Sequence, residues 1–132
     1  MSQAYLARYY LRSLEMAVKR EVDPCFIPND DQQVINLEHV LPEKPGENWP
    51  QFTPEVAAAF YRRLGNMALL QAKSNSDLRS SSFAEKKRIY TESPFHLTRR
   101  IAEGNDWTSN SIAERQAYMA QWAVKTWPVK VS

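Results

Sequence analysis

The segment VINLEHVLP, at residues 34–42, determines much of the expected fold. Apolar and polar residues alternate along it, which is typical of a strand with one buried face, and Pro42 ends the pattern. A second apolar run, NMALL, occupies residues 66–70 and follows Gly65, a residue type that commonly ends helices. Two short strands separated by a helical segment predict an antiparallel β-hairpin with a helical insertion.

The segments around the hairpin favour helices. Thr53-Pro54 predicts the start of the inserted helix, because threonine caps helices well and proline suits the first helical position. Ser2 is the expected cap of a first helix that ends near Arg20, with an apolar face formed by Leu6, Tyr10, Leu14 and Ala17. Three later helices are signalled by the capping box Ser82-Phe83-Ala84-Glu85, by Ser93-Pro94, and by Thr108 or Ser109. The expected fold class is α+β, mainly α-helical with a short antiparallel β-hairpin.

Composition sets the broad class of protein. A chain of 132 residues with 43% apolar residues can bury the core of one domain. Its single cysteine, Cys25, excludes an intrachain disulfide and favours a reducing compartment, so a cytoplasmic location is expected. No apolar run approaches the ~20 residues that span a bilayer, and the N-terminus lacks the apolar block of a signal peptide. We therefore expect a soluble protein with no membrane partner.

The distribution of charge indicates where a polyanion could bind. The net charge is only +2, but residues 1–72 hold 7 Lys and Arg against 9 Asp and Glu, whereas residues 73–132 hold 10 against 6. The basic excess therefore follows the hairpin, and solvated helix faces are the alternative explanation. The candidates for contacts with DNA phosphates are Arg79, Lys86, Lys87 and Arg115.

Four residues around the hairpin suit the hydrolysis of a phosphodiester, which needs a base for the water and a cation for the developing charge. His39, with an ordinary pKa near ~6.5, can act as a neutral base. Glu38 and Asn75 offer oxygen ligands of the kind that Mg²⁺ or Mn²⁺ prefers. Asn66, across the hairpin, can hold the imidazole in its reactive orientation.

One feature of the strand conflicts with a joint site. Strict alternation sends the side chains of Glu38 and His39 to opposite faces of the sheet. We therefore expect the strand to twist or break there, shortly before Pro42.

Several motifs, taken in order, resemble a known family. They are EHVLP at 38–42, LGNMALL at 64–70, Asn75-Ser76, FAEKK at 83–87, and the closing Trp107, Ile112, Arg115, Trp122 and Trp127. The chain is similar, from about Tyr5 to Trp127, to the C-terminal nuclease domain of GmrSD-type restriction endonucleases, which belong to the HNH, or ββα-metal (His-Me finger), nucleases. The resemblance implies a ββα-metal core built around the hairpin.

The resemblance also implies roles for individual residues. His39 corresponds to the general base, Asn66 to the orienting residue and Asn75 to a metal ligand. Glu38 stands where many HNH enzymes carry a metal-binding aspartate, and Lys86 matches the lysine of a Phe-x-x-Lys element. The implied cofactor is Mg²⁺, Mn²⁺ or another divalent ion.

Family members usually carry an upstream ParB-like nucleotide-binding domain and restrict modified DNA. We therefore expect residues 1–132 to be one HNH-type domain from a larger restriction protein. Its expected parts are an N-terminal helix and loop (1–32), a ββα-metal core (33–91) and C-terminal helices (92–132).

The sequence leads to one main hypothesis, a metal-dependent DNA endonuclease acting on foreign or modified DNA. A domain that is catalytically idle, and binds nucleic acid or mediates assembly with a partner domain, is the alternative. At the residue level, His39 could be structural, Gly65-Asn66 a turn and Asn75 a helix cap. We interpret the tryptophans as core residues, and His96 as a surface or structural residue.

Overall fold

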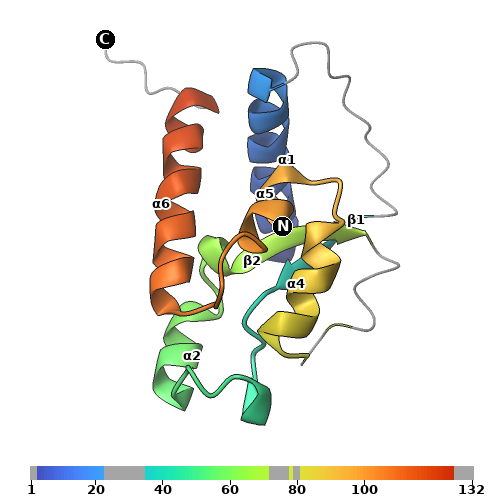
Figure 1. The fold of residues 1–132 in the computed structure, drawn as a ribbon. Helices are drawn as coiled ribbons and strands as arrows, with labels where there is room; N and C mark the ends of the chain where they lie inside the picture. The colour runs from blue at the N-terminus through green and yellow to red at the C-terminus, as the bar shows by residue number, and fades with distance from the viewer. Residues whose placement is uncertain (1–2, 23–34, 72–77, 79–80, 127–132) are drawn as a thin grey trace.

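The protein folds into helices around a two-stranded sheet, as shown by a computed structural model that describes residues 3–22, 35–71, 78 and 81–126 (Figure 1). This architecture confirms the predicted α+β class. In chain order the elements are α1 (Gln3–Val22), β1 (Ile35–His39), the 3-10 turn η2 (Gly46–Asn48), α2 (Pro54–Phe60), the 3-10 turn η3 (Leu64–Asn66), β2 (Met67–Gln71), α4 (Phe83–Thr91), α5 (His96–Ile101) and α6 (Ser109–Thr126).

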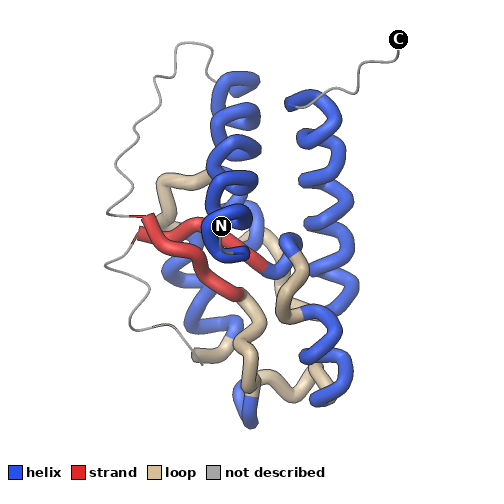
Figure 2. Tube along the Cα trace, turned by 180° about the vertical axis from the view of Figure 1, so that it is seen from behind, coloured by secondary structure: helices blue, strands red, loops and turns tan. Residues whose placement is uncertain are grey.

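The two strands form the predicted antiparallel hairpin. Ile35 pairs with Gln71 at one end of the ladder and His39 with Met67 at the other, and α2 lies in the long connection between the strands. The views from the front and from behind show α1 on one side of the sheet and α4 on the other (Figures 1 and 2). The sheet therefore separates two hydrophobic clusters.

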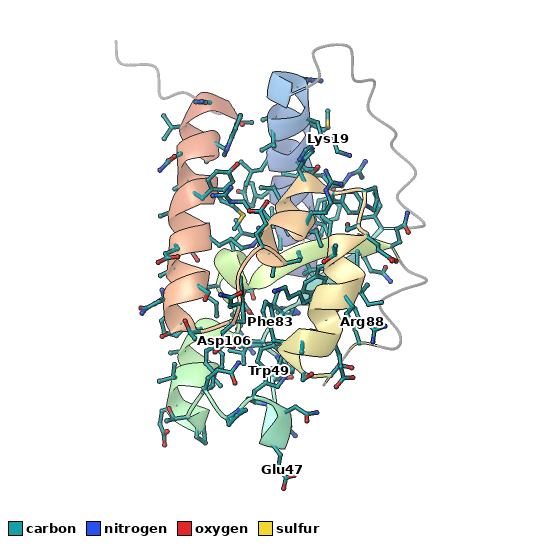
Figure 3. The ribbon with its side chains drawn as sticks, viewed as in Figure 1. Lys19, Glu47, Trp49, Phe83, Arg88 and Asp106 are labelled. Atoms are coloured by element: carbon teal, nitrogen blue, oxygen red, sulfur yellow. The ribbon has the colours of Figure 1, made fainter. Side chains whose placement is uncertain are left out.

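The larger cluster, here called the α4 core, contains two of the tryptophans that the sequence assigned to the interior, Trp49 and Trp107. Trp49 lies against Phe83, with 6.4 Å between ring centroids, and Arg88 is on the outer side of α4 (Figure 3). The α4 core consists of Val40, Leu41, Trp49, Phe52, Ala57, Ala68, Leu70, Leu78, Phe83, Tyr90, Ile101, Ala102, Trp107 and Ile112. The smaller cluster, the α1 core, consists of Leu11, Leu14, Val18, Ile35, Leu69, Leu97 and Met119.

The face of α1 that packs inward differs from the predicted one. Leu6 and Tyr10, expected inside, are 36% and 41% exposed. Leu14 is buried as predicted, and Ala17 is half-buried. The other buried apolar residues are Ala7, Leu11 and Val18, and this stripe faces the sheet and α6. Both stripes have helical spacing and differ by about one residue of rotation, so periodicity alone did not distinguish them. The correction leaves tyrosines and arginines on the outer surface of α1.

The predicted helix caps at Thr53, Ser82 and Thr108 are confirmed, whereas the start predicted at Ser93-Pro94 is wrong: α5 begins at His96 after Phe95, and Ser93 Oγ accepts from the Phe95 amide ahead of the helix. Thr53 Oγ1 accepts a hydrogen bond from the Val56 amide at 3.2 Å, and Ser82 Oγ accepts one from the Glu85 amide at 3.3 Å. Thr108 caps the first turn of α6 in the same way. The expected cap at Ser2 lies outside the described residues. These side chains satisfy amides that the first turn of a helix leaves without partners, which fixes where α2, α4 and α6 begin.

Gly65 allows a close approach rather than ending a helix as predicted. It lies inside η3, and a Cβ at this position would clash with the backbone carbonyl of Ile112 in α6. The Gly65 amide also donates to Gln116 Oε1 at 3.2 Å. The absence of a side chain thus lets α6 pack directly on the turn that carries Asn66.

No helix in the described part of the chain combines the length and the apolar character needed to cross a membrane.

Candidate active site at the end of strand β1

His39 is the last residue of β1 and is half-buried. Its ring stacks on Tyr61, which directly follows α2, with 4.3 Å between ring centroids and 19° between ring planes. The backbone of the next residue, Val40, donates to Asn66 O at 2.9 Å and so continues the contact with the other side of the hairpin. The imidazole is therefore held by the strand behind it and by an aromatic ring beside it.

Lys86 is the main electrostatic feature beneath this strand end. It comes from α4, is fully buried, and donates to Glu38 Oε1 at 3.3 Å, to His39 O at 2.8 Å and to Val40 O at 2.9 Å. Three partners use all three protons of an ammonium group. Lys86 thus holds the segment containing His39 through both a carboxylate and two backbone carbonyls.

Glu38 and His39 lie on opposite faces of the sheet. Glu38 pairs with Ala68, which belongs to the α4 core, whereas His39 pairs with Met67, which packs against the α1 core. The strand break that we predicted at this pair does not occur, because the ladder is regular through His39. The two side chains therefore have different contacts: Glu38 pairs with Lys86, and His39 stacks on Tyr61.

Burial and the neighbouring ammonium group change the titration of His39. Loss of solvent lowers the pKa of the imidazole, and the positive charge of Lys86 lowers it further, against the opposite effect of Glu43. Burial also raises the pKa of Glu38 and lowers that of Lys86, and in each case the partner's charge opposes the shift. Because its pKa lies below the usual 6.5, His39 is neutral at pH 7 and can accept a proton.

Asn66 uses its whole side chain to hold the loop after β1. Its Oδ1 accepts from the Leu41 amide at 2.8 Å and from Trp107 Nε1 at 3.0 Å, and its Nδ2 donates to Leu41 O and Tyr61 O, both at 3.0 Å. These four bonds involve every donor and acceptor position that a buried amide normally fills. The predicted bond to the imidazole is not among them. Asn66 instead acts on His39 through the loop and through Tyr61.

The Trp107→Phe variant tests this network with a small change. Phenylalanine keeps most of the buried ring but removes the donor to Asn66 Oδ1, which still accepts from Leu41. We expect the free energy of unfolding to fall by at least about 1 kcal/mol, the usual value of one such hydrogen bond, because the smaller ring also leaves a cavity in the core. Urea denaturation of both proteins measures it, and an unchanged midpoint would show that this bond contributes nothing.

The predicted phosphate contacts of Lys86 and Arg115 do not fit the structure. Lys86 has no exposed surface, and Arg115 is 7% exposed. Arg115 instead donates to Leu97 O at 2.7 Å and to Met67 O at 2.9 Å, and burial lowers its pKa to about 10. Both cations therefore hold backbone segments of the core. Lys87 is half-buried on α4 beside a surface hollow, and Arg79 lies outside the described residues.

Glu38 does not fit the role of a metal ligand. Its Oε1 is paired with Lys86, and its Oε2 is buried and has no hydrogen-bond partner among the described residues. A divalent cation on Oε2 would lie close to the buried ammonium group, and like charges repel strongly there. The described residues contain no group of three or more His, Cys, Asp and Glu side chains that could hold a metal ion. Asn75, the other predicted ligand, lies outside the described part of the chain.

Two residues of this site were not found from the sequence. Tyr61 stacks on His39, and Trp107 completes the bonds of Asn66. Nothing in the sequence separated Tyr61 from the other aromatic residues. For Trp107, its place among the motifs of the family resemblance was a signal, but it suggested no role.

The fold and the site together define a small α+β domain in which an antiparallel hairpin and a following helix, β1, β2 and α4, support a histidine at a strand end. A family model described as "GmrSD restriction endonucleases, C-terminal domain" matches residues 2–122. The chain belongs to this family, which confirms the resemblance seen in its motifs. No curated protein matches the chain.

Proposed function

We propose that this domain hydrolyses phosphodiester bonds of DNA as the nuclease part of a restriction endonuclease, with His39 as the general base. The family to which the chain belongs is the C-terminal domain of GmrSD restriction endonucleases. The observation that carries the proposal is the state of His39, a half-buried imidazole whose pKa is lowered by burial and by Lys86. A neutral imidazole fixed at a strand end is suited to take a proton from water.

Each neighbour of His39 has a defined part in this proposal. Tyr61 stacks on the imidazole and restricts its rotation. Lys86 fixes the backbone of His39, and its charge disfavours the protonated ring before the reaction. Asn66 fixes the loop and the Tyr61 carbonyl. We assign these three as positioning residues, because none of them needs to touch the reacting atoms.

A divalent ion, Mg²⁺ or Mn²⁺, belongs to the proposal through the family resemblance, and it would stabilise negative charge on the phosphate. Asn75 stays a proposed ligand, whereas Glu38 is left out because of its pairing with Lys86. An upstream ParB-like nucleotide-binding domain, selection of modified DNA and a cytoplasmic location are further parts of the proposal that come from the resemblance and the composition.

The second candidate function is a catalytically idle domain that binds DNA or assembles with a partner domain. The pairing of Glu38 with Lys86 favours it, because the residue expected to bind metal is already neutralised by a buried cation. Such a domain would bind DNA without cutting it.

Supercoiled plasmid incubated with the purified chain in Mg²⁺, in Mn²⁺ and in EDTA tests the two candidates. Metal-dependent nicking or linearisation, absent in EDTA, is expected for the nuclease. Binding of the plasmid without cleavage in either metal would instead support the idle domain.

The pH dependence of cleavage tests the protonation state of the base. The neutral form of His39 is the active form, and its pKa lies below the 6.5 of an ordinary histidine. Activity should therefore fall only when the pH drops below 6.5. We expect the acid limb of the initial-rate profile to have its midpoint below pH 6.5. A midpoint at or above this value, with the melting temperature constant across the range, would contradict the assignment.

A further inference from the structure

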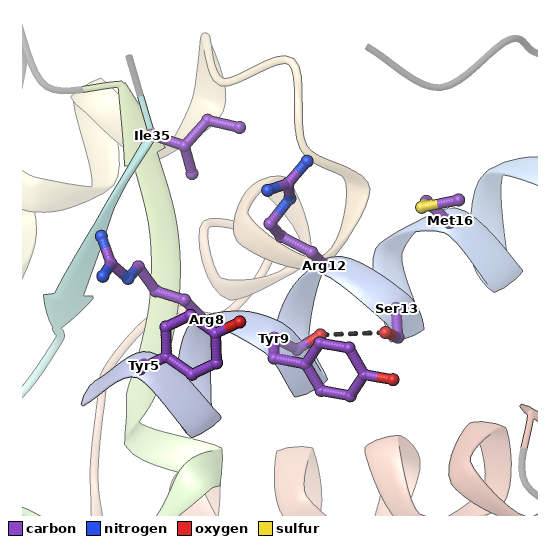
Figure 4. A pocket seen from close by; sticks show the side chains of 7 residues that line it. All are labelled: Tyr5, Arg8, Tyr9, Arg12, Ser13, Met16 and Ile35. Carbon is purple, nitrogen blue, oxygen red and sulfur yellow. Dashed lines mark hydrogen bonds between the residues drawn. The ribbon is translucent and has the colours of Figure 1, made fainter. Parts of the chain in front are cut away.

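The outer surface of α1 forms a pocket of about 300 Å³ beside the start of β1 (Figure 4). The residues that line it include Tyr5, Arg8, Tyr9, Arg12, Ser13 and Ile35. Tyr5 and Tyr9 are 48% and 51% exposed, and Arg8 and Arg12 are half-buried beside them. Large aromatic surfaces left on the outside of a domain commonly mark a binding surface.

The chemistry of this pocket suits an anionic partner. Arg8 and Arg12 supply two guanidinium groups, and none of the described residues that line it is acidic. The carboxylate of Glu15, on the same helix, is buried on another side of α1, where it accepts from the His96 amide at 2.7 Å and the Leu97 amide at 2.8 Å. The described lining of the pocket therefore carries positive charge, and planar guanidinium groups bind phosphates with good geometry.

The pocket lies on the face of the sheet that carries His39. Ile35 and His39 are four residues apart on β1, so both side chains point to the same face. Figure 4 shows Arg8 extending from α1 toward β1. Four residues of a strand span roughly 13 Å at ~3.3 Å each, which corresponds to about four base-pair steps of 3.4 Å. One duplex can therefore reach both places.

We propose that this pocket is a DNA-contact surface, in which Arg8 and Arg12 bind backbone phosphates a few base pairs from the phosphate at His39. The proposal rests on the proposed function, because DNA is taken as the substrate. Tyr5 and Tyr9 supply flat surfaces and hydroxyl groups beside the two cations, a combination that contacts sugars and phosphates. The surface also replaces the predicted contacts of Lys86 and Arg115, which are buried.

The test measures binding separately from cleavage. A fluorescein-labelled DNA duplex is titrated in EDTA with the full chain carrying His39→Ala, and anisotropy gives the dissociation constant at several salt concentrations. Adding Arg8→Gln and Arg12→Gln should weaken binding roughly tenfold or more, and should reduce the slope of log K against log salt by about 1.8, or 0.9 for each lost phosphate contact.

Two matched variants show whether position and charge both matter. Arg88→Gln with Arg100→Gln removes the same charge from exposed positions on α4 and α5, and is expected to change the affinity much less. Arg8→Lys with Arg12→Lys keeps the charge and is expected to retain most of the salt dependence. The melting temperature of each variant confirms that the fold is intact.

Equal losses in the two glutamine pairs would overturn the proposal, because binding would then follow net charge alone. Unchanged affinity of the Arg8→Gln, Arg12→Gln variant for DNA would also overturn the proposal, because the pocket would then not contact DNA. Failure of the nuclease proposal has a different signature. If the chain binds DNA through Arg8 and Arg12 but never cleaves it, the contact surface stands and the catalytic assignment fails.

Discussion

Replacing His39 by alanine is expected to lower the rate of DNA cleavage by roughly 10²–10⁴-fold, the usual contribution of a general base. Among the described residues of the site, only His39 combines an imidazole whose pKa is lowered by burial with a place at the strand end. The fold should survive, because the ring is only half-buried and its removal costs mainly the stacking on Tyr61. Initial rates of plasmid nicking, with circular dichroism as the check on folding, measure the effect.

His96 provides the matched control. It is the second of the two histidines, is half-buried, and its side chain lies at the start of α5 rather than at the end of β1. His96→Ala is expected to keep activity close to that of the parent. Full activity of His39→Ala in the presence of metal would mean that another group takes the proton, and the site would have to be placed elsewhere.

Replacing Lys86 by methionine is expected to produce the largest loss of stability, about 3–5 kcal/mol, because it leaves the buried Glu38 without its counter-charge. The carbonyls of His39 and Val40 also lose their donor. Equilibrium unfolding in urea measures the change. Lys87→Met, at the next position of α4, is the control and should shift the free energy of unfolding by less than about 1 kcal/mol.

The partner substitution separates the ion pair from general damage to the core. Glu38→Gln in the Lys86→Met background removes the uncompensated buried charge, so the double variant should be more stable than Lys86→Met alone. A coupling energy of about 1–3 kcal/mol in the double-mutant cycle is expected. Simple additivity of the two single changes would mean that the pair does not stabilise the strand end.

The Lys86→Met variant should also change the pKa of His39. Removing the ammonium group removes one of the two influences that lower the pKa of the imidazole. The pKa of His39 should therefore rise, which NMR titration of the ring protons detects where the variant is folded. A purely structural effect of Lys86 on folding would leave that pKa unchanged.

Local patterns in the sequence were sufficient for the elements of the fold. Alternation of apolar and polar residues gave β1, and the capping residues Thr53 and Ser82 gave the starts of α2 and α4. These features depend on contacts within a few residues, such as the bond from the Glu85 amide to Ser82 Oγ. The same local information failed for α1, where two apolar stripes overlapped and only packing against the sheet and α6 selected the inner one.

The sequence by itself determined the α+β class, the hairpin, the starts of α2, α4 and α6 and, through its motifs, the family. Only the tertiary structure decided what the polar residues do. Lys86 meets Glu38 across 48 positions of the chain, and Trp107 meets Asn66 across 41. Such contacts depend on the directions of side chains from elements that pack together, which no local pattern encodes. For this reason two cations predicted to bind DNA prove to be buried supports, while Arg8 and Arg12 of α1 are half-buried and line a pocket.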